Sequence, residues 1–99
     1  MNHPEPTPPP LPQPAAFSAF ELKAGVVYEV TTPFEDFDGV TYPAGDRWEF
    51  LSQNFFPYDA GLTLYVRRAG SGEGTIRLQD YDEAQGRIIG RFSEYVRRV

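Results

Sequence analysis

The chain has 99 residues, a formal net charge of −5 and no cysteine. The missing cysteines exclude a disulfide framework, a thiolate nucleophile and a zinc–cysteine site, and the acidic balance argues against general affinity for nucleic acid. No apolar run is long enough to span a membrane, and the N-terminus lacks the basic start and apolar core of a secretory signal. We therefore expect a cytoplasmic protein without a membrane segment and without a cofactor.

Residues 1–16 form a proline-rich segment that holds seven of the ten prolines. Proline fixes φ and lacks an amide hydrogen, so we predict a disordered, polyproline-II-like tail ahead of one domain at residues 17–99. The tail contains P-x-x-P spacings of the kind that bind SH3-type domains, although no basic residue flanks them. A linker or tail is the favoured interpretation, and docking of the tail on the domain is the alternative.

The first half of the domain alternates strand-forming runs with turn residues. Residues 17–23 are expected to seal one edge of the core, and residues 26–32 are predicted to form a strand that ends at Pro33. Residues 34–45 are predicted to be a long loop with turns at Asp38-Gly39 and at residues 43–45, because these residue types favour turns.

Further strands are predicted at residues 46–52, 61–68 and 75–79. Residues 53–60 are predicted to be a connecting loop with an unusual number of rings, and residues 69–74 a glycine-rich hairpin connection. Because side chains alternate between the two faces of a strand, the expected inward positions are Trp48, Phe50, Ser52, Leu62, Leu64, Val66, Ile76 and Leu78.

The C-terminal segment changes to a helical period. Apolar residues between Ile88 and Val99 recur at helical spacings and predict a helix over residues 82–97, with Asp80 as its N-cap in a capping box. Gly86 and Gly90 stand four residues apart and suggest that the helix backbone lies close against the sheet. The whole pattern predicts a mainly β domain, a small SH3-like β-barrel of four or five strands with a C-terminal α-helix.

Two motifs resemble one family over about residues 22–96. G-x-x-Y-x-V-x-x-x-F-x-D-x-D-G runs from Gly25 to Gly39, and N-F-x-P-Y-x-x-G-L-T-L runs from Asn54 to Leu64. Together they are similar to a family of small bacterial domains of unknown function, DUF3601. The resemblance implies a compact bacterial domain with no assigned activity and no catalytic residue to carry over.

The residues of common catalytic and metal sites are missing or misplaced. His3 is the only histidine and lies in the tail, so a histidine-dependent triad is not expected. The glycine-rich residues 70–74 are not followed by the lysine of a phosphate loop. Asp36 and Asp38 fit part of a calcium loop, but Phe34 and Gly45 take its two end ligand positions. We expect no enzyme and no metal site.

The rings of residues 53–60 allow two interpretations: Phe55 or Phe56 plugs the barrel with Tyr58 over it, or the rings lie exposed and bind a partner. The second hypothesis describes a protein-interaction module, monomeric or weakly self-associating, that binds a protein or peptide. Its candidate residues are four surface aromatics and three acids that would select a basic partner, namely Phe37, Tyr42, Phe55, Tyr58, Asp36, Asp38 and Asp59.

Two alternatives belong to other classes of protein. A nucleic-acid-associated factor would use the C-terminal arginines, Arg87, Arg91, Arg97 and Arg98. A small enzyme would act through the carboxylates of Asp36 and Asp38.

Overall fold

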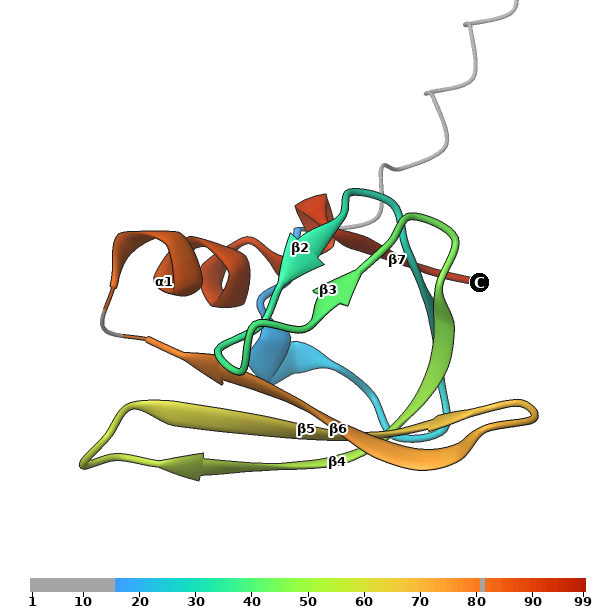
Figure 1. Ribbon diagram of the computed structural model, residues 1–99, viewed down its shortest axis with the longest axis horizontal. Helices are drawn as coiled ribbons and strands as arrows, with labels where there is room; N and C mark the ends of the chain where they lie inside the picture. Colours follow the sequence, from blue (N-terminus) through green and yellow to red (C-terminus); the bar gives the residue numbers. More distant parts are fainter. Residues whose placement is uncertain (1–15, 81) are drawn as a thin grey trace, which may run out of the picture.

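The computed structural model describes residues 16–80 and 82–99; the tail predicted at residues 1–16 lies, but for Ala16, outside the described residues (Figure 1). Antiparallel strands and one short α-helix make up most of the described chain. In chain order the elements are η1 (Ala19–Glu21), β1 (Val27–Val30), β2 (Phe34–Glu35), β3 (Thr41–Tyr42), β4 (Arg47–Phe56), β5 (Gly61–Arg68), β6 (Gly72–Gln79), α1 (Glu83–Gly90), η2 (Phe92–Glu94) and β7 (Val96–Arg98).

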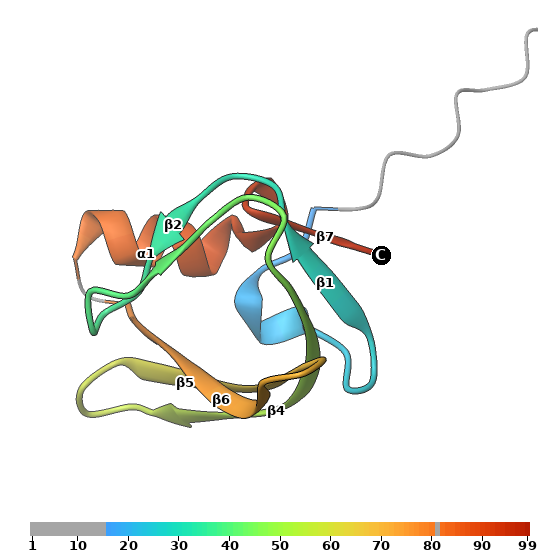
Figure 2. The ribbon, with the colours of Figure 1, turned by 45° about the vertical axis from the view of Figure 1, so that its right-hand side comes forward.

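Five strands form one antiparallel sheet in the order β6-β5-β4-β1-β7, and β2 and β3 form a separate hairpin. Strand β4 curves, so that its first half pairs with β1 and nearly its whole length pairs with β5 (Figure 2). The mainly β class with a helix is confirmed. The sheet does not close into a barrel, because β6 and β7 are both edge strands in this order.

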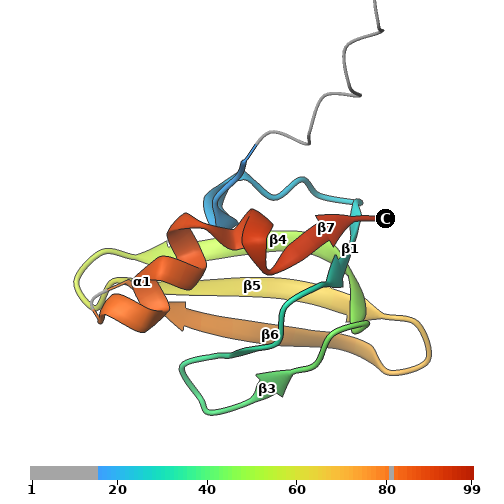
Figure 3. The same ribbon diagram turned by 90° about the horizontal axis from the view of Figure 1, so that it is seen from above.

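The core lies on the concave face of the sheet, under α1 and η2 (Figure 3). Alternate residues of β5, β6 and the first part of β4, up to Phe50, point into it as predicted. Helix α1 and η2 close the other side with Ile88, Ile89 and Phe92. Each fully buried large apolar side chain stabilises the fold by about 1.5–3 kcal/mol. The buried strand residues are Tyr28, Val30, Trp48, Phe50, Leu62, Leu64, Val66, Ile76, Leu78 and Val96.

The prediction of a loop at residues 53–60 is wrong, because β4 continues to Phe56 and only residues 57–60 form the turn. The longer strand contains a β-bulge between Phe50 and Ser52. The bulge inserts Leu51 as an extra residue and reverses which positions face inward. Ser52, predicted to face the core, is therefore exposed.

The glycine turns at both ends of the β2–β3 hairpin are confirmed. Gly39 has φ +80° and Gly45 has φ +93°, a region that L side chains rarely adopt. The predicted loop of residues 34–45 therefore contains two short strands as well as its turns. The hairpin lies beside the edge strand β6, where the Phe37 amide donates to the Arg77 carbonyl.

The predicted helix over residues 82–97 is wrong in its second half. Helix α1 ends at Gly90, and the chain then passes through η2 into β7, which pairs with β1. Pairing with β1 satisfies more backbone groups there than a lone helix end could. The N-cap of α1 is Asp82 rather than the predicted Asp80, since the Asp82 carboxylate accepts a hydrogen bond from the Gln85 amide at 2.7 Å.

The glycines of α1 do not lie against the sheet, contrary to the prediction. A Cβ at Gly90 would meet nothing within 4 Å, and one at Gly86 would meet only the Asp80 side chain, at 2.9 Å. The glycine face of the helix is therefore turned away from the core, and Ile88 and Ile89 make the contact instead.

Candidate functional site

A buried polar network fixes the connection between β2 and β3. Asp36 is only 4% exposed, and its carboxylate accepts from the backbone amides of Asp38 and Val40 at 3.0 and 2.9 Å. The Tyr42 hydroxyl donates to the same carboxylate at 2.9 Å. Burial and this carboxylate raise the pKa of Tyr42 well above its ordinary value. The phenol therefore stays protonated and keeps the loop closed.

The prediction that Tyr42 and Asp36 lie on the surface is wrong. Tyr42 is buried on the inward side of β3, where its ring stacks on Phe34 with 5.0 Å between centroids. The Arg68 guanidinium lies 5.6 Å from the Tyr42 ring centroid and makes two hydrogen bonds to Asp46, at 3.0 and 2.7 Å. This pairing raises the pKa of Arg68. Both predicted residues are thus structural, because two loop amides and the Tyr42 phenol share the Asp36 carboxylate as their acceptor.

Phe37 is held at the tip of the same loop with its ring outward. Its amide donates to the Arg77 carbonyl of β6 at 2.7 Å, which ties the loop to the sheet edge. The Arg77 guanidinium lies 5.9 Å from the Phe37 ring centroid and donates to Asp38 at 3.2 Å. The Phe37 residue remains 43% exposed. Asp38, predicted to select a partner's charge, is already paired within the chain.

Phe55 and Phe56 point to opposite faces of the sheet. Phe55 pairs with buried Leu62 and shares its face, where its ring meets Phe20 edge-on at 5.4 Å between centroids. Phe56 pairs with Gly61 and therefore stands on the outer face. Gly61 has no side chain, and the Asp59 carboxylate fills the position beside it, with its Oδ1 atom 2.9 Å from where a Cβ of residue 61 would stand.

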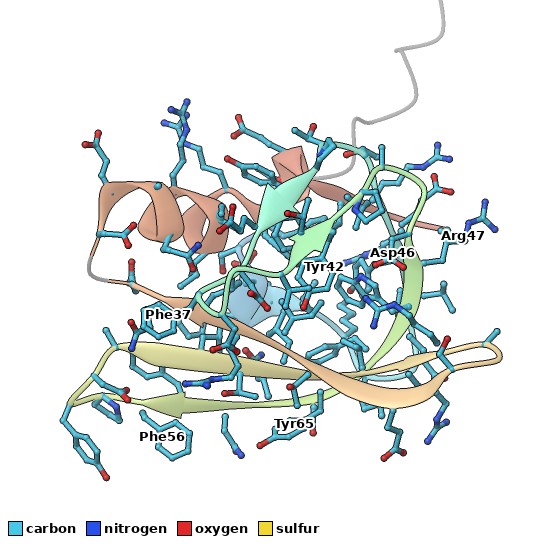
Figure 4. The ribbon with its side chains drawn as sticks, viewed as in Figure 1. Phe37, Tyr42, Asp46, Arg47, Phe56 and Tyr65 are labelled. Carbon is cyan, nitrogen blue, oxygen red and sulfur yellow. The ribbon has the colours of Figure 1, made fainter. Side chains whose placement is uncertain are left out.

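Phe56 lines a surface groove of about 340 Å³. It lies at the end of the molecule that carries the β4–β5 turn, between the loop tip and the outer face of the sheet (Figure 4). Phe56 is 45% exposed and Tyr58 is 93% exposed, so all three rings of the groove are accessible. The residues that form its walls and floor include Phe37, Phe56, Tyr58, Gly61, Thr63 and Arg77.

Of the residues predicted to bind a partner, the groove brings together Phe37, Tyr58 and Asp59. Phe55 lies outside it, on the other face. Phe56 was not among the predicted site residues, because residues 53–60 were predicted to be a loop and only the longer strand, with its bulge, turns Phe56 outward. Asp59 also has a structural role, since one of its carboxylate oxygens accepts from the Gly61 amide at 3.0 Å.

The C-terminal arginines do not act as one group. Arg97 donates to Glu29 at 2.6 Å, and Arg47 donates to the same carboxylate at 2.8 Å. Hydrogen bonds from Arg47 and Arg97 lower the pKa of Glu29. Arg98 lies over the Phe17 ring, with 5.9 Å to its centroid. The other two C-terminal arginines, Arg87 and Arg91, line a shallow hollow on the face of α1 that carries Gly86 and Gly90.

Two further features bear on the class of protein. Within residues 16–80 and 82–99, no three side chains of the metal-ligating types gather closely enough to hold an ion. Neither α1 nor any other helix of the described chain has the length and apolar character needed to cross a membrane. The fold and the groove define a small antiparallel β domain with a helix packed over its sheet.

The chain belongs to the DUF3601 family, described as a domain of unknown function, whose model matches residues 15–99. This confirms the resemblance found in the two motifs. An integron cassette protein from the mobile metagenome of Vibrio cholerae has a similar solved structure, with a TM-score of 0.74 and 37% identity. The similarity covers 79% of this chain and 88% of that protein. No curated protein matches the chain.

Proposed function

We propose that this chain is a non-enzymatic, bacterial, cytoplasmic domain that binds a partner protein by seating a peptide segment in the groove of Phe37, Phe56 and Tyr58. The observation that carries the proposal is the meeting of these three exposed rings, which come from the β2–β3 connection, the end of β4 and the β4–β5 turn. Aromatic side chains around a recess are typical anchors of protein interfaces.

The geometry favours a large apolar side chain as the peptide's anchor. Phe56 lines the groove, and Leu62 and Thr63 continue it along β5. An apolar ring or aliphatic chain of the partner would replace the water there and contact aromatic faces on two sides. Each such buried side chain contributes about 1.5–3 kcal/mol before the cost of ordering the peptide.

The charge preference rests on fewer acids than the sequence suggested. Asp36 is buried, and the exposed Asp38 is already paired with Arg77, so a partner's cation would have to compete with Arg77 for it. Asp59 lines the groove and has a second carboxylate oxygen beyond the one that accepts from Gly61. We therefore expect a basic residue next to the apolar anchor, with a modest effect because Asp59 is exposed.

A displayed library of random peptides, selected on the full chain, tests the proposal. The enriched peptides should carry a large apolar residue, and calorimetry should give a Kd at least about tenfold weaker for Phe56→Ala. Phe20→Ala is the matched control, because Phe20 is 43% exposed like the groove rings but lies outside the groove. Equal binding by the wild type and Phe56→Ala, or no enrichment at all, would reject the groove as the binding site.

A further inference from the structure

Within residues 16–80 and 82–99, one stretch of β4 has a strand on only one side. Strand β1 pairs with β4 at residues 47–49, and the backbone of Phe50 makes the last bonds on that side, to Gly25 and Val26. From Ser52 to Phe56 the register of β4 involves β5 alone. We define Leu51–Phe56 as the open edge. In Figure 3 this part of β4 forms the border of the sheet near the β4–β5 turn.

The open edge presents unpaired backbone groups at two residues. In an antiparallel ladder, successive residues turn their N–H and C=O groups alternately toward one neighbour and the other. The register with β5 therefore turns the groups of Gln53 and Phe55 away from β5. Within the described chain, neither residue makes a backbone hydrogen bond to a segment outside the sheet. The Gln53 side chain donates to the Phe20 carbonyl of η1 at 3.0 Å.

The other edges of the sheet are protected in ways that this edge is not. On β6, Phe37 donates to the Arg77 carbonyl and the Gln85 side chain accepts from the Gln79 amide at 3.4 Å. Strand β7 is three residues long and carries two arginines. Short length, charge and covering are the usual devices that keep edges from pairing. The open edge, LSQNFF, contains no charge, proline or glycine.

We propose that the open edge pairs antiparallel with the open edge of a second copy of this chain. Two features favour a copy as the occupant. A strand that is free of charge does not repel its own duplicate, although the whole chain carries −5. An antiparallel pair of identical strands is self-complementary about a two-fold axis, so it satisfies the same groups on both copies. The chain's own residues 4–14 cannot serve, because their prolines lack the amide donors of a ladder.

The unpaired backbone N–H and C=O groups of Gln53 and Phe55 set the register between the two copies of β4. If Gln53 of one copy bonds Phe55 of the other, the two-fold axis passes beside Asn54, and both sets of backbone groups are satisfied. Phe55 and Phe20, now 42% and 43% exposed, then become buried near the same rings of the second copy. The contact is short, so the dimer should be weak, with a Kd of about 10 μM to 1 mM. This inference does not depend on the groove, which lies on the outer face.

Cysteine cross-linking of the full chain tests the register, because the natural sequence has no cysteine. In the proposed dimer the two Asn54 Cα atoms lie about 4.5 Å apart, within the range that a disulfide spans. Asn54→Cys should therefore oxidise to a covalent dimer at least about tenfold faster than the control Ser52→Cys, whose two copies would be about 14 Å apart. The control residue is exposed and stands on the same face of the same strand.

A second variant separates pairing from random collision. Adding Phe55→Lys to Asn54→Cys places like charges across the axis and should slow cross-linking by about tenfold. Sedimentation of the wild-type chain should show a dimer that grows with concentration up to about 1 mM. Equal oxidation of the two cysteine variants, or a wild-type chain that stays monomeric at that concentration, would overturn the proposal. Pairing with a strand of another protein in place of the copy would also overturn it.

Discussion

The hydrogen bond from Tyr42 to Asp36 offers the sharpest test of how the loop is held. Tyr42→Phe keeps the buried ring and its stacking on Phe34 but removes the donor at 2.9 Å. Asp36 then keeps only its two backbone amide partners in a nearly dry position. Hydrogen bonds to charged groups contribute about 1.5–3 kcal/mol, so the free energy of unfolding should fall by about 2 kcal/mol.

Urea unfolding followed by tryptophan fluorescence measures this change directly. Trp48 is the only tryptophan, and it is buried between Tyr28 and Phe92. With a slope of about 1–2 kcal/mol per molar urea, the midpoint should drop by about 1–2 M. Tyr65→Phe is the control: it removes an exposed hydroxyl that accepts from Asn54, and it should change stability by less than about 0.5 kcal/mol.

The hydrogen bond from Tyr42 to Asp36 also predicts that the stability of the fold depends on pH in the alkaline range. The folded-state pKa of Tyr42 is raised above the ordinary value of 10.0. A raised pKa means that the folded state holds this proton more tightly, so the stabilisation is complete below pH 10 and is lost as the pH rises further. Wild-type stability should therefore fall more steeply above pH 10 than that of Tyr42→Phe. A variant as stable as the wild type, with the same alkaline slope, would refute the idea that Asp36 and Tyr42 hold the loop.

Two further predictions concern the helix and the sheet surface. Gly90→Ala should stabilise the domain by about 0.5–1 kcal/mol in thermal unfolding, because the added methyl group enters open space and alanine favours a helix; destabilisation would mean that the glycine face is packed after all. Glu29→Gln should flatten the acid limb of the stability curve, since the lowered pKa of Glu29 gives stability that is present above pH 4.5 and lost as the pH falls below it. An unchanged acid limb in that variant would show that the bonds from Arg47 and Arg97 do not persist in solution.

Local patterns predicted the parts of the fold that depend on neighbouring residues alone. The strands β1, β5 and β6 and their inward residues follow from alternation, and the turns at Gly39 and Gly45 follow from residue type. The C-terminal segment could not be predicted in this way. Val96 fits a helical stripe as well as a strand, and pairing with β1, about 70 positions earlier in the chain, decides between them.

The candidate site was predictable only in part, for a similar reason. Asp36 and Tyr42 are residue types that are common in surface loops. Their burial arises because two loop amides and the Tyr42 phenol need a common acceptor. No spacing in the sequence shows that requirement. Phe37 and Tyr58 could be predicted as exposed, since they stand at the tips of connections where no strand can cover them.

The bulge at Leu51 determines both proposed surfaces. If β4 paired with β5 without it, Phe56 would share the face of Trp48 and Phe50 and point into the core. With the extra residue, Phe56 turns outward into the groove, and Gln53 and Phe55 take the inward face beside Phe20. The same insertion also bends β4 away from β1, which leaves the open edge without a neighbour. A single inserted residue thus both exposes a ring for a partner and frees a strand edge for a second copy.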